Sequence, residues 1–88
     1  MPLLIVHKAG SALGFYDLEG KHETSVPVGT HPHELVLSAD CRLAYVTDNG
    51  AMRVEHPGRG GHTVSIVDLK ERRRTGEIDL GEFHRPHG

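Results

Sequence analysis

The stretch GTHPHELVLSADCRLAYVTDNG, residues 29 to 50, joins a His-Pro-His triplet to two short apolar runs separated by a polar turn. Runs of this length, bounded by turn residues, predict β-strands over Glu34–Ser38 and Leu43–Thr47. The triplet is then either a metal site or a connection between strands. Whether the stretch is repeated decides how far each interpretation can be taken.

The whole chain shows the same pattern of short apolar runs. No window of helical length carries a sustained apolar stripe with the 3.6-residue period of a helix. Pro27 cannot donate a backbone hydrogen bond, so the strand that contains it is expected at a sheet edge. The sequence predicts an all-β fold of seven short strands at residues 3–6, 13–17, 24–28, 34–38, 43–47, 63–68 and 74–80.

Comparison of the sequence with itself reveals an internal repeat. Leu3–Gly10 aligns with Leu43–Gly50 at a spacing of 40 residues, and Leu13–Leu18 aligns with Val64–Leu69 at a spacing of 51. The second copy therefore contains an insertion between its strands. A unit of about 40 residues with four short strands is typical of an antiparallel β-propeller blade.

These segments also resemble a known family. Leu43–Gly50, followed by Thr63–Leu69 and Gly76–Gly81, resembles the YVTN-type β-propeller repeat of lactonase-like and surface-layer propellers. The resemblance implies propeller blades, about seven in a complete ring, but a propeller fold hosts many activities. The chain has Asp48 where the family motif has Asn, and Cys41 where the family turn has Gly.

The repeat divides the chain into parts of two blades. Residues 1–30 are expected to supply strands two to four of one blade, and residues 31–82 a complete blade with an inserted loop at 51–61. Residues 83–88 would lead into a missing blade. Because a closed propeller needs at least four blades, we expect a fragment of a larger propeller, with a ring of several copies as the alternative. The expected partners are the remaining blades or further copies, since both outer blade faces would be apolar.

Composition excludes several classes of protein. The 88 residues have a formal net charge of −2, and the basic run Arg72–Arg74 is flanked by acidic residues, so no nucleic-acid partner is expected. Cys41 is the single cysteine, which excludes a disulfide within the chain. The apolar run Leu3–Val6 is too short for a signal peptide or a membrane span, so the sequence predicts a soluble chain, and only a signal upstream would indicate export.

Cys41 lies in the turn between the first two strands of the complete blade. If this turn requires a positive φ at Cys41, its Cβ costs about 1 kcal/mol compared with glycine. No neighbouring pattern supplies a base that would activate the thiol, so a structural role is favoured.

The connections between blades are the first candidate site. Pro32-His33 recurs as Pro86-His87, and in a propeller such a crossover runs from the rim toward the central axis. Each proline is expected to favour extended geometry in the residue before it. His and carboxylate side chains suit zinc, copper or iron, although a tetrahedral site needs three or four of them to converge. The candidate ligand-binding residues here are His31, His33, Glu34, His84 and His87, with a purely architectural crossover as the alternative.

The inserted loop is the second candidate site. Loops on a rigid β-scaffold often carry binding groups, and this one gathers charged and imidazole side chains. The alternative is a solvated hairpin extension. The candidate ligand-binding residues are Arg53, Glu55, His56 and Arg59.

Catalytic motifs are weak throughout. No Ser or Cys lies in a recognisable nucleophile motif. Asp17 and Asp68 recur at one strand end, which indicates a structural role rather than acid–base chemistry. We therefore expect a non-catalytic scaffold that binds a protein or a small molecule. The alternative is a lactonase-like hydrolase, for which the resemblance implies a central divalent metal ion in the complete propeller.

Overall fold

A computed structural model describes residues 2–53 and 58–88 of the chain. All seven predicted strands are present, each with its ends shifted by no more than two residues, and the all-β prediction is confirmed. Within the described ranges no helix is long and apolar enough to cross a membrane. The strands are β1 (Leu3–His7), β2 (Ala12–Tyr16), β3 (His22–Pro27), β4 (Pro32–Leu37), β5 (Leu43–Asp48), β6 (Thr63–Asp68) and β7 (Arg73–Asp79).

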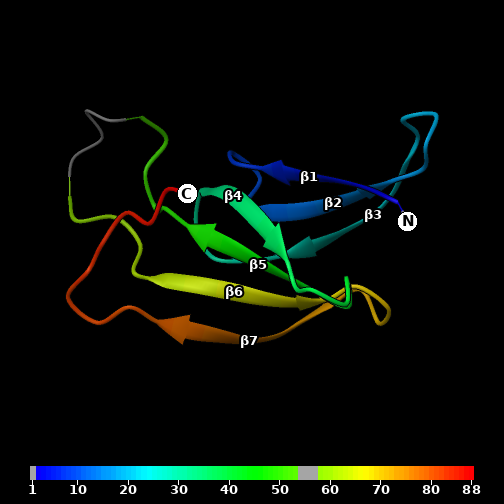
Figure 1. The fold of residues 1–88 in the computed structure, drawn as a ribbon. Helices are drawn as coiled ribbons and strands as arrows, with labels where there is room; N and C mark the ends of the chain where they lie inside the picture. The colour runs from blue at the N-terminus through cyan, green and yellow to red at the C-terminus, as the bar shows by residue number, and fades with distance from the viewer. Residues whose placement is uncertain (1, 54–57) are drawn as a thin grey trace.

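The strands form two antiparallel sheets in which every strand pairs with its neighbour in sequence. One sheet has the order β1-β2-β3 and the other the order β4-β5-β6-β7 (Figure 1). The second sheet is a complete four-stranded blade, and the first supplies three strands of the preceding blade. β3, which ends at Pro27, lies at the edge of its sheet as predicted.

The two sheets pack face to face around one apolar core. Alternation along β5 sends Ala44, Val46 and Asp48 into this interface and leaves the intervening side chains partly exposed. β1 contacts β4 and β3 contacts β7, so the first strands and the last strands of the two sheets lie beside each other. This is how neighbouring blades pack in a propeller. The fully buried apolar cluster comprises Leu13, Phe15, Val26, Ala44, Val46 and Val67.

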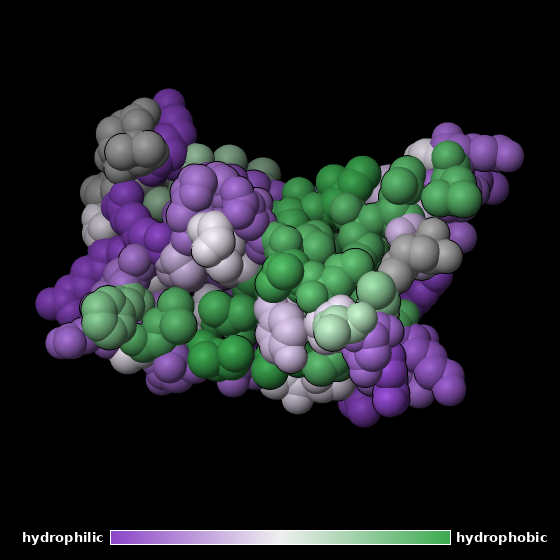
Figure 2. Space-filling view, viewed as in Figure 1, coloured by the Kyte–Doolittle hydropathy of each residue, from purple (hydrophilic) through white to green (hydrophobic). Residues whose placement is uncertain are grey.

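The opposite face of each sheet also carries apolar side chains. Leu3 and Ile5 of β1 are 42% and 46% exposed, and Val36 of β4 is 63% exposed. Figure 2 shows apolar residues gathered over a broad area of the face in view, with hydrophilic residues toward both ends. Each sheet therefore buries one apolar face within the described chain and leaves a second apolar face open.

The turn between β4 and β5 adopts the strained geometry anticipated for Cys41. The φ of Cys41 is +58°, and its amide donates to the Ser38 carbonyl at 2.9 Å. The Ser38 hydroxyl and the amide of Arg42 both donate to the Asp40 carboxylate, and together they lower the pKa of Asp40 below its ordinary value. Hydrogen bonds on both sides thus hold the exposed Cys41 in the left-handed region.

The strand-end aspartates have the structural role that their repetition indicated. Asp17 and Asp68 each accept two backbone amide hydrogen bonds from the turn that follows, at 2.8–2.9 Å. Side chains of this kind replace backbone partners where the chain reverses. The two residues therefore close equivalent turns in the two blades.

We predict that Cys41→Gly stabilises the protein, because glycine adopts a φ of +58° without the Cβ penalty. The gain in the free energy of unfolding is at most about 1 kcal/mol, since glycine also increases the entropy of the unfolded chain. Urea denaturation followed by circular dichroism measures it. Cys41→Ala is the matched control, because it removes the thiol and keeps the Cβ. Equal stabilisation by both variants would show that the thiol, rather than the backbone, is responsible.

Candidate functional site

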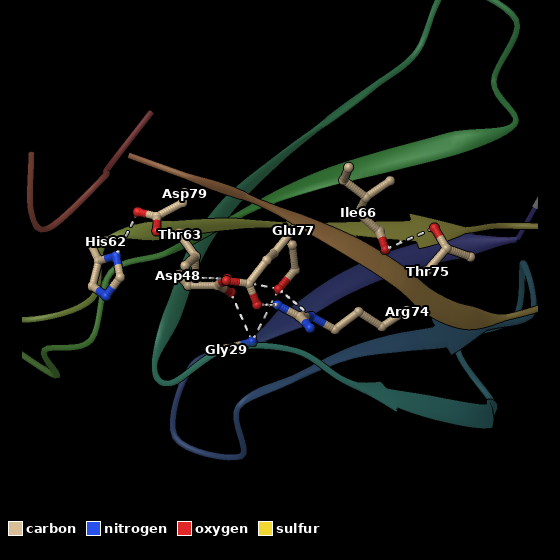
Figure 3. Close-up of polar contacts among 10 residues, drawn as sticks. Gly29, Asp48, His62, Thr63, Ile66, Arg74, Thr75, Glu77 and Asp79 are labelled. Atoms are coloured by element: carbon tan, nitrogen blue, oxygen red, sulfur yellow. Dashed lines mark hydrogen bonds and ion pairs between the residues drawn. The ribbon is translucent and has the colours of Figure 1, made fainter. Parts of the chain in front are cut away.

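A buried carboxylate at the end of β5 organises the connections between the blades. Asp48 is 1% exposed, and its Oδ1 accepts a hydrogen bond from the Gly29 amide at 3.0 Å. Its Oδ2 accepts hydrogen bonds from the hydroxyls of Thr63 at 2.8 Å and Ser65 at 2.7 Å (Figure 3). A Cβ at Gly29 would overlap the Asp48 carboxyl group. The crossover between the sheets therefore begins at a residue that only glycine fits.

Ser65 completes this network. A hydroxyl offers one donor and two acceptor positions. Ser65 donates to Asp48 and lies within hydrogen-bonding distance of the Gly29 amide, at 3.2 Å, and of Arg74 Nε, at 2.8 Å. The guanidinium of Arg74 also binds Glu77 at 2.9 Å. A cation thus joins the network one hydroxyl away from the buried carboxylate.

The two residues that flank Asp48 hold the second crossover. The Thr47 hydroxyl accepts a hydrogen bond from the Glu34 amide at 3.1 Å and lies 3.1 Å from the carbonyl oxygen of His87. Asn49 Nδ2 donates to the carbonyl of Pro86 at 3.0 Å. Thr47, Asp48 and Asn49 therefore fix both crossovers from a single strand end.

Both crossovers make the same turn before their prolines. The φ of His31 is +46° and that of Arg85 is +54°, so the expectation of extended geometry before Pro32 and Pro86 is wrong. Specific hydrogen bonds override the general preference, since the His31 amide donates to Ser11 Oγ at 3.1 Å and the Arg85 amide donates to a backbone carbonyl at 2.8 Å. The prolines thus follow a left-handed turn in each blade.

Three of the predicted crossover residues converge. The imidazole rings of His33 and His87 lie 3.6 Å apart between centroids, and Glu34 Oε1 lies 3.8 Å from His33 Nδ1. One ligating atom from each of these three side chains lies within 4.8 Å of the others. We call these residues the crossover cluster.

An irregularity in β4 allows two adjacent residues to join this cluster. Consecutive side chains of a regular strand point to opposite faces. Here Pro32 pairs with Asp48 but Leu35 pairs with Val46, so β4 advances by three residues where β5 advances by two. A bulge of this kind changes the direction of a side chain. It brings His33 and Glu34 to one region of the surface.

A pocket of about 330 Å³ opens beside the crossover cluster. Three cationic side chains line it, those of Lys8, Arg53 and Arg85, and no acidic residue is among its described lining. Cationic groups that share a concave surface concentrate anions there. The remaining lining residues are His33, Asn49, Met52 and His87.

The other predicted crossover residues lie elsewhere. His31 turns toward the first sheet, with Nδ1 3.0 Å from the carbonyl of Lys8. The ring of His84 packs 5.6 Å from that of His62, and its Nδ1 lies 2.8 Å from the carbonyl of Glu82. These two histidines do not join the crossover cluster.

His62 belongs to a separate contact on the exposed end of β7. Its Nδ1 lies 3.1 Å from the Asp79 carboxylate, which also accepts the Gly81 amide at 2.7 Å (Figure 3). The Gly81 amide and the His62 ring hold the pKa of Asp79 below its ordinary value. This contact supports the strand end near His84.

The residues predicted in the inserted loop also do not all lie at one site. Arg53 lines the pocket, whereas Arg59 is exposed and does not. Glu55 and His56 lie outside the described residues. Sequence reasoning missed Lys8, although the internal repeat aligns Lys8 with Asp48 and so places both at the same strand end.

The fold defines the described chain as one β-propeller blade with three strands of the preceding blade packed against it. Among solved structures, the chain is similar to hydrazine synthase of Kuenenia stuttgartiensis, a protein that contains a β-propeller. The TM-score is 0.80 at 17% sequence identity, over 97% of this chain and 22% of that chain, so the likeness concerns the fold. Comparison of the sequence with family models and with curated proteins found no match.

We predict that Asp48→Ala lowers the free energy of unfolding by about 3 kcal/mol, because it leaves buried donors without their acceptor. Asp48→Asn should cost less, since its carbonyl still accepts the Gly29 amide while its NH₂ group faces two hydroxyls. Urea denaturation is the measurement. Glu71→Ala removes an exposed carboxylate and should change stability by less than about 0.5 kcal/mol. A loss at Asp48 no larger than that at Glu71 would contradict the structural role of Asp48.

Proposed function

We propose that this chain is a two-blade segment of a YVTN-like β-propeller that acts as a scaffold and binds a small anionic ligand where its crossovers meet. Residues 1–30 belong to one blade, residues 31–82 form the next, with its insertion at 51–61, and residues 83–88 enter a third. The observation that carries this proposal is the pocket that Lys8, Arg53 and Arg85 line.

The charge of this pocket is a local feature. The whole chain has a formal net charge of −2, yet three side chains that are positive at neutral pH share one concavity. Arginine and lysine bind carboxylate and phosphate groups through charge-assisted hydrogen bonds. The rings of His33 and His87 add N–H groups that can donate hydrogen bonds. A small carboxylate or phosphate compound is the class of ligand that this lining fits.

The open sheet faces support the assignment to a larger propeller. Val36 lies beside a shallow apolar hollow on the outer face of the second sheet, and Tyr45 and Val64 also line that hollow. Leu3 and Ile5 occupy the outer face of the first sheet. Blades bury such faces against their neighbours, so the partners of these surfaces are further blades or further copies of the chain.

A lactonase-like hydrolase is the second candidate function. The convergence of His33, Glu34 and His87 favours it, because two imidazoles and a carboxylate can hold a metal ion that supports hydrolysis. Turnover of a sugar lactone, dependent on both metal and Glu34, would favour this function over the scaffold.

We predict that the protein self-associates through its open faces and that Val36→Glu lowers its mass in solution, because a charge then replaces an apolar side chain in the contact. Size exclusion coupled to light scattering gives the mass, and circular dichroism checks the fold. Leu18→Glu is the matched control, because Leu18 is 77% exposed but lies in the turn after β2 rather than on a sheet face. A folded monomer, or an equal effect of both variants, would count against open blade faces.

We predict that the protein binds inorganic phosphate and that Lys8→Met weakens this binding about tenfold, the usual order for one charge-assisted contact to an anion. Isothermal titration calorimetry at low ionic strength measures the affinity. Lys70→Met removes an exposed lysine from the turn before β7 and should leave the affinity unchanged. If the two variants behave alike, phosphate senses only the overall charge and the pocket is not a site.

A further inference from the structure

We propose that His33, Glu34 and His87 form a binding site for a divalent transition-metal ion, with zinc as the best match to the ligand set. Two imidazoles and one carboxylate are the protein ligands of a zinc site that keeps its fourth position for water or another ligand. Such a site goes beyond the anion-binding scaffold, since it requires no anion.

The three ligand groups lie slightly farther apart than the ligands of one bound zinc ion. Zinc binds nitrogen and carboxylate oxygen at about 2.0–2.2 Å, so two ligand atoms of one tetrahedral ion lie about 3.3–3.6 Å apart. His33 Nδ1 and Glu34 Oε1 are 3.8 Å apart, so the two atoms must approach each other by a few tenths of an ångström to bind one ion. All three ligand atoms lie within 4.8 Å of one another, and His87 and Glu34 are exposed at the surface. We expect rotation of these two exposed side chains toward His33 to close the remaining gap.

His33 supplies an independent indication. Its Nδ1 is shielded from solvent and has no hydrogen-bond partner within the described residues. A buried polar atom without a partner costs about 1–3 kcal/mol, so native proteins rarely retain one. Among residues 2–53 and 58–88, the carboxylate oxygen recorded beside it is Glu34 Oε1, which at 3.8 Å is beyond hydrogen-bonding distance. A metal ion between the two would satisfy both atoms.

The backbone around the cluster is fixed before any ion binds. The β4 bulge sets the directions of His33 and Glu34, and Thr47 holds the Glu34 amide and the His87 carbonyl at 3.1 Å each. Asn49 fixes Pro86, the residue before His87. Metal sites require this kind of support from groups that do not bind the metal. Thr47 and Asn49 are therefore positioning residues.

The position of the site follows from the repeat. His33 and His87 follow equivalent prolines in two successive crossovers, and equivalent residues of neighbouring blades approach each other near a propeller axis. Each blade contributes one histidine. The site therefore exists only when the second crossover is docked against the first.

The experiment uses untagged protein that has been treated with a chelator and dialysed. Co²⁺ titration followed by visible absorption reports the coordination geometry, and calorimetry with Zn²⁺ gives the affinity and the stoichiometry. We expect each chain to bind one metal ion tightly. The visible absorption of the bound Co²⁺ should have the intensity typical of four- or five-coordinate cobalt. His33→Ala, His87→Ala and Glu34→Gln should each weaken zinc binding about tenfold or more.

Two histidines outside the cluster provide matched controls. His22→Ala removes a histidine that lies beside Tyr16 on the first sheet, and His84→Ala removes one from the same segment as His87. Both should leave the zinc affinity within about twofold. Absence of tight binding, or equal losses in the control variants and the cluster variants, would overturn the site. His87 is exposed, so His87→Ala decides the outcome even if His33→Ala fails to fold by circular dichroism.

The proposals of a metal site and of an anion pocket can be tested independently of each other. Glu34→Gln should lose zinc and retain phosphate binding measured in the presence of chelator. Lys8→Met should lose phosphate and retain zinc. Loss of both ligands in each variant would indicate unfolding of the crossovers and would overturn the assignment of separate roles.

Discussion

The packing of one blade on the next depends on the buried carboxylate of Asp48. The apolar core between the sheets is not directional, so burial of Phe15 or Val46 permits many relative orientations. The hydrogen bonds of Asp48 are directional and reach one residue of the crossover and two of β6. Because the site is buried, failure to form them would leave several polar groups without partners. The carboxylate thereby selects one orientation of the two sheets.

The residues on either side of Asp48 extend this control to the second crossover. Asp48 points into the interface, and its neighbours Thr47 and Asn49 reach the second crossover instead. Three consecutive residues at one strand end thus connect the start of one crossover to the end of the next. The pocket and the crossover cluster lie between these two attachments. Their geometry is as rigid as the strand end that supports them.

Local sequence patterns predicted the strands well. The seven strands, the edge position of Pro27 and the roles of Asp17 and Asp68 all depend on residues close together in the chain. The positive φ of Cys41 was considered only as a condition, and it too is a property of a local turn. The prediction of extended geometry at His31 and Arg85 was wrong, because the hydrogen bonds that override the proline preference come from distant segments. The contact of His33 with His87 and the pocket around Lys8 depend on how two blades pack. A bulge such as that in β4 leaves no mark in the pattern of apolar residues, so the orientation of Glu34 could not be derived from it.

The crossover cluster joins residues that are far apart along the chain, and this has a consequence for polymer entropy. An ion held by His33 and His87 would close a loop that contains nearly all of the second sheet. Because the unfolded chain binds the ion only weakly, binding to the folded state raises the free energy of unfolding by mass action. The closed loop also lowers the conformational entropy of partly opened forms. The free energy of unfolding would then rise with the concentration of free metal, in a small domain whose own apolar core is limited.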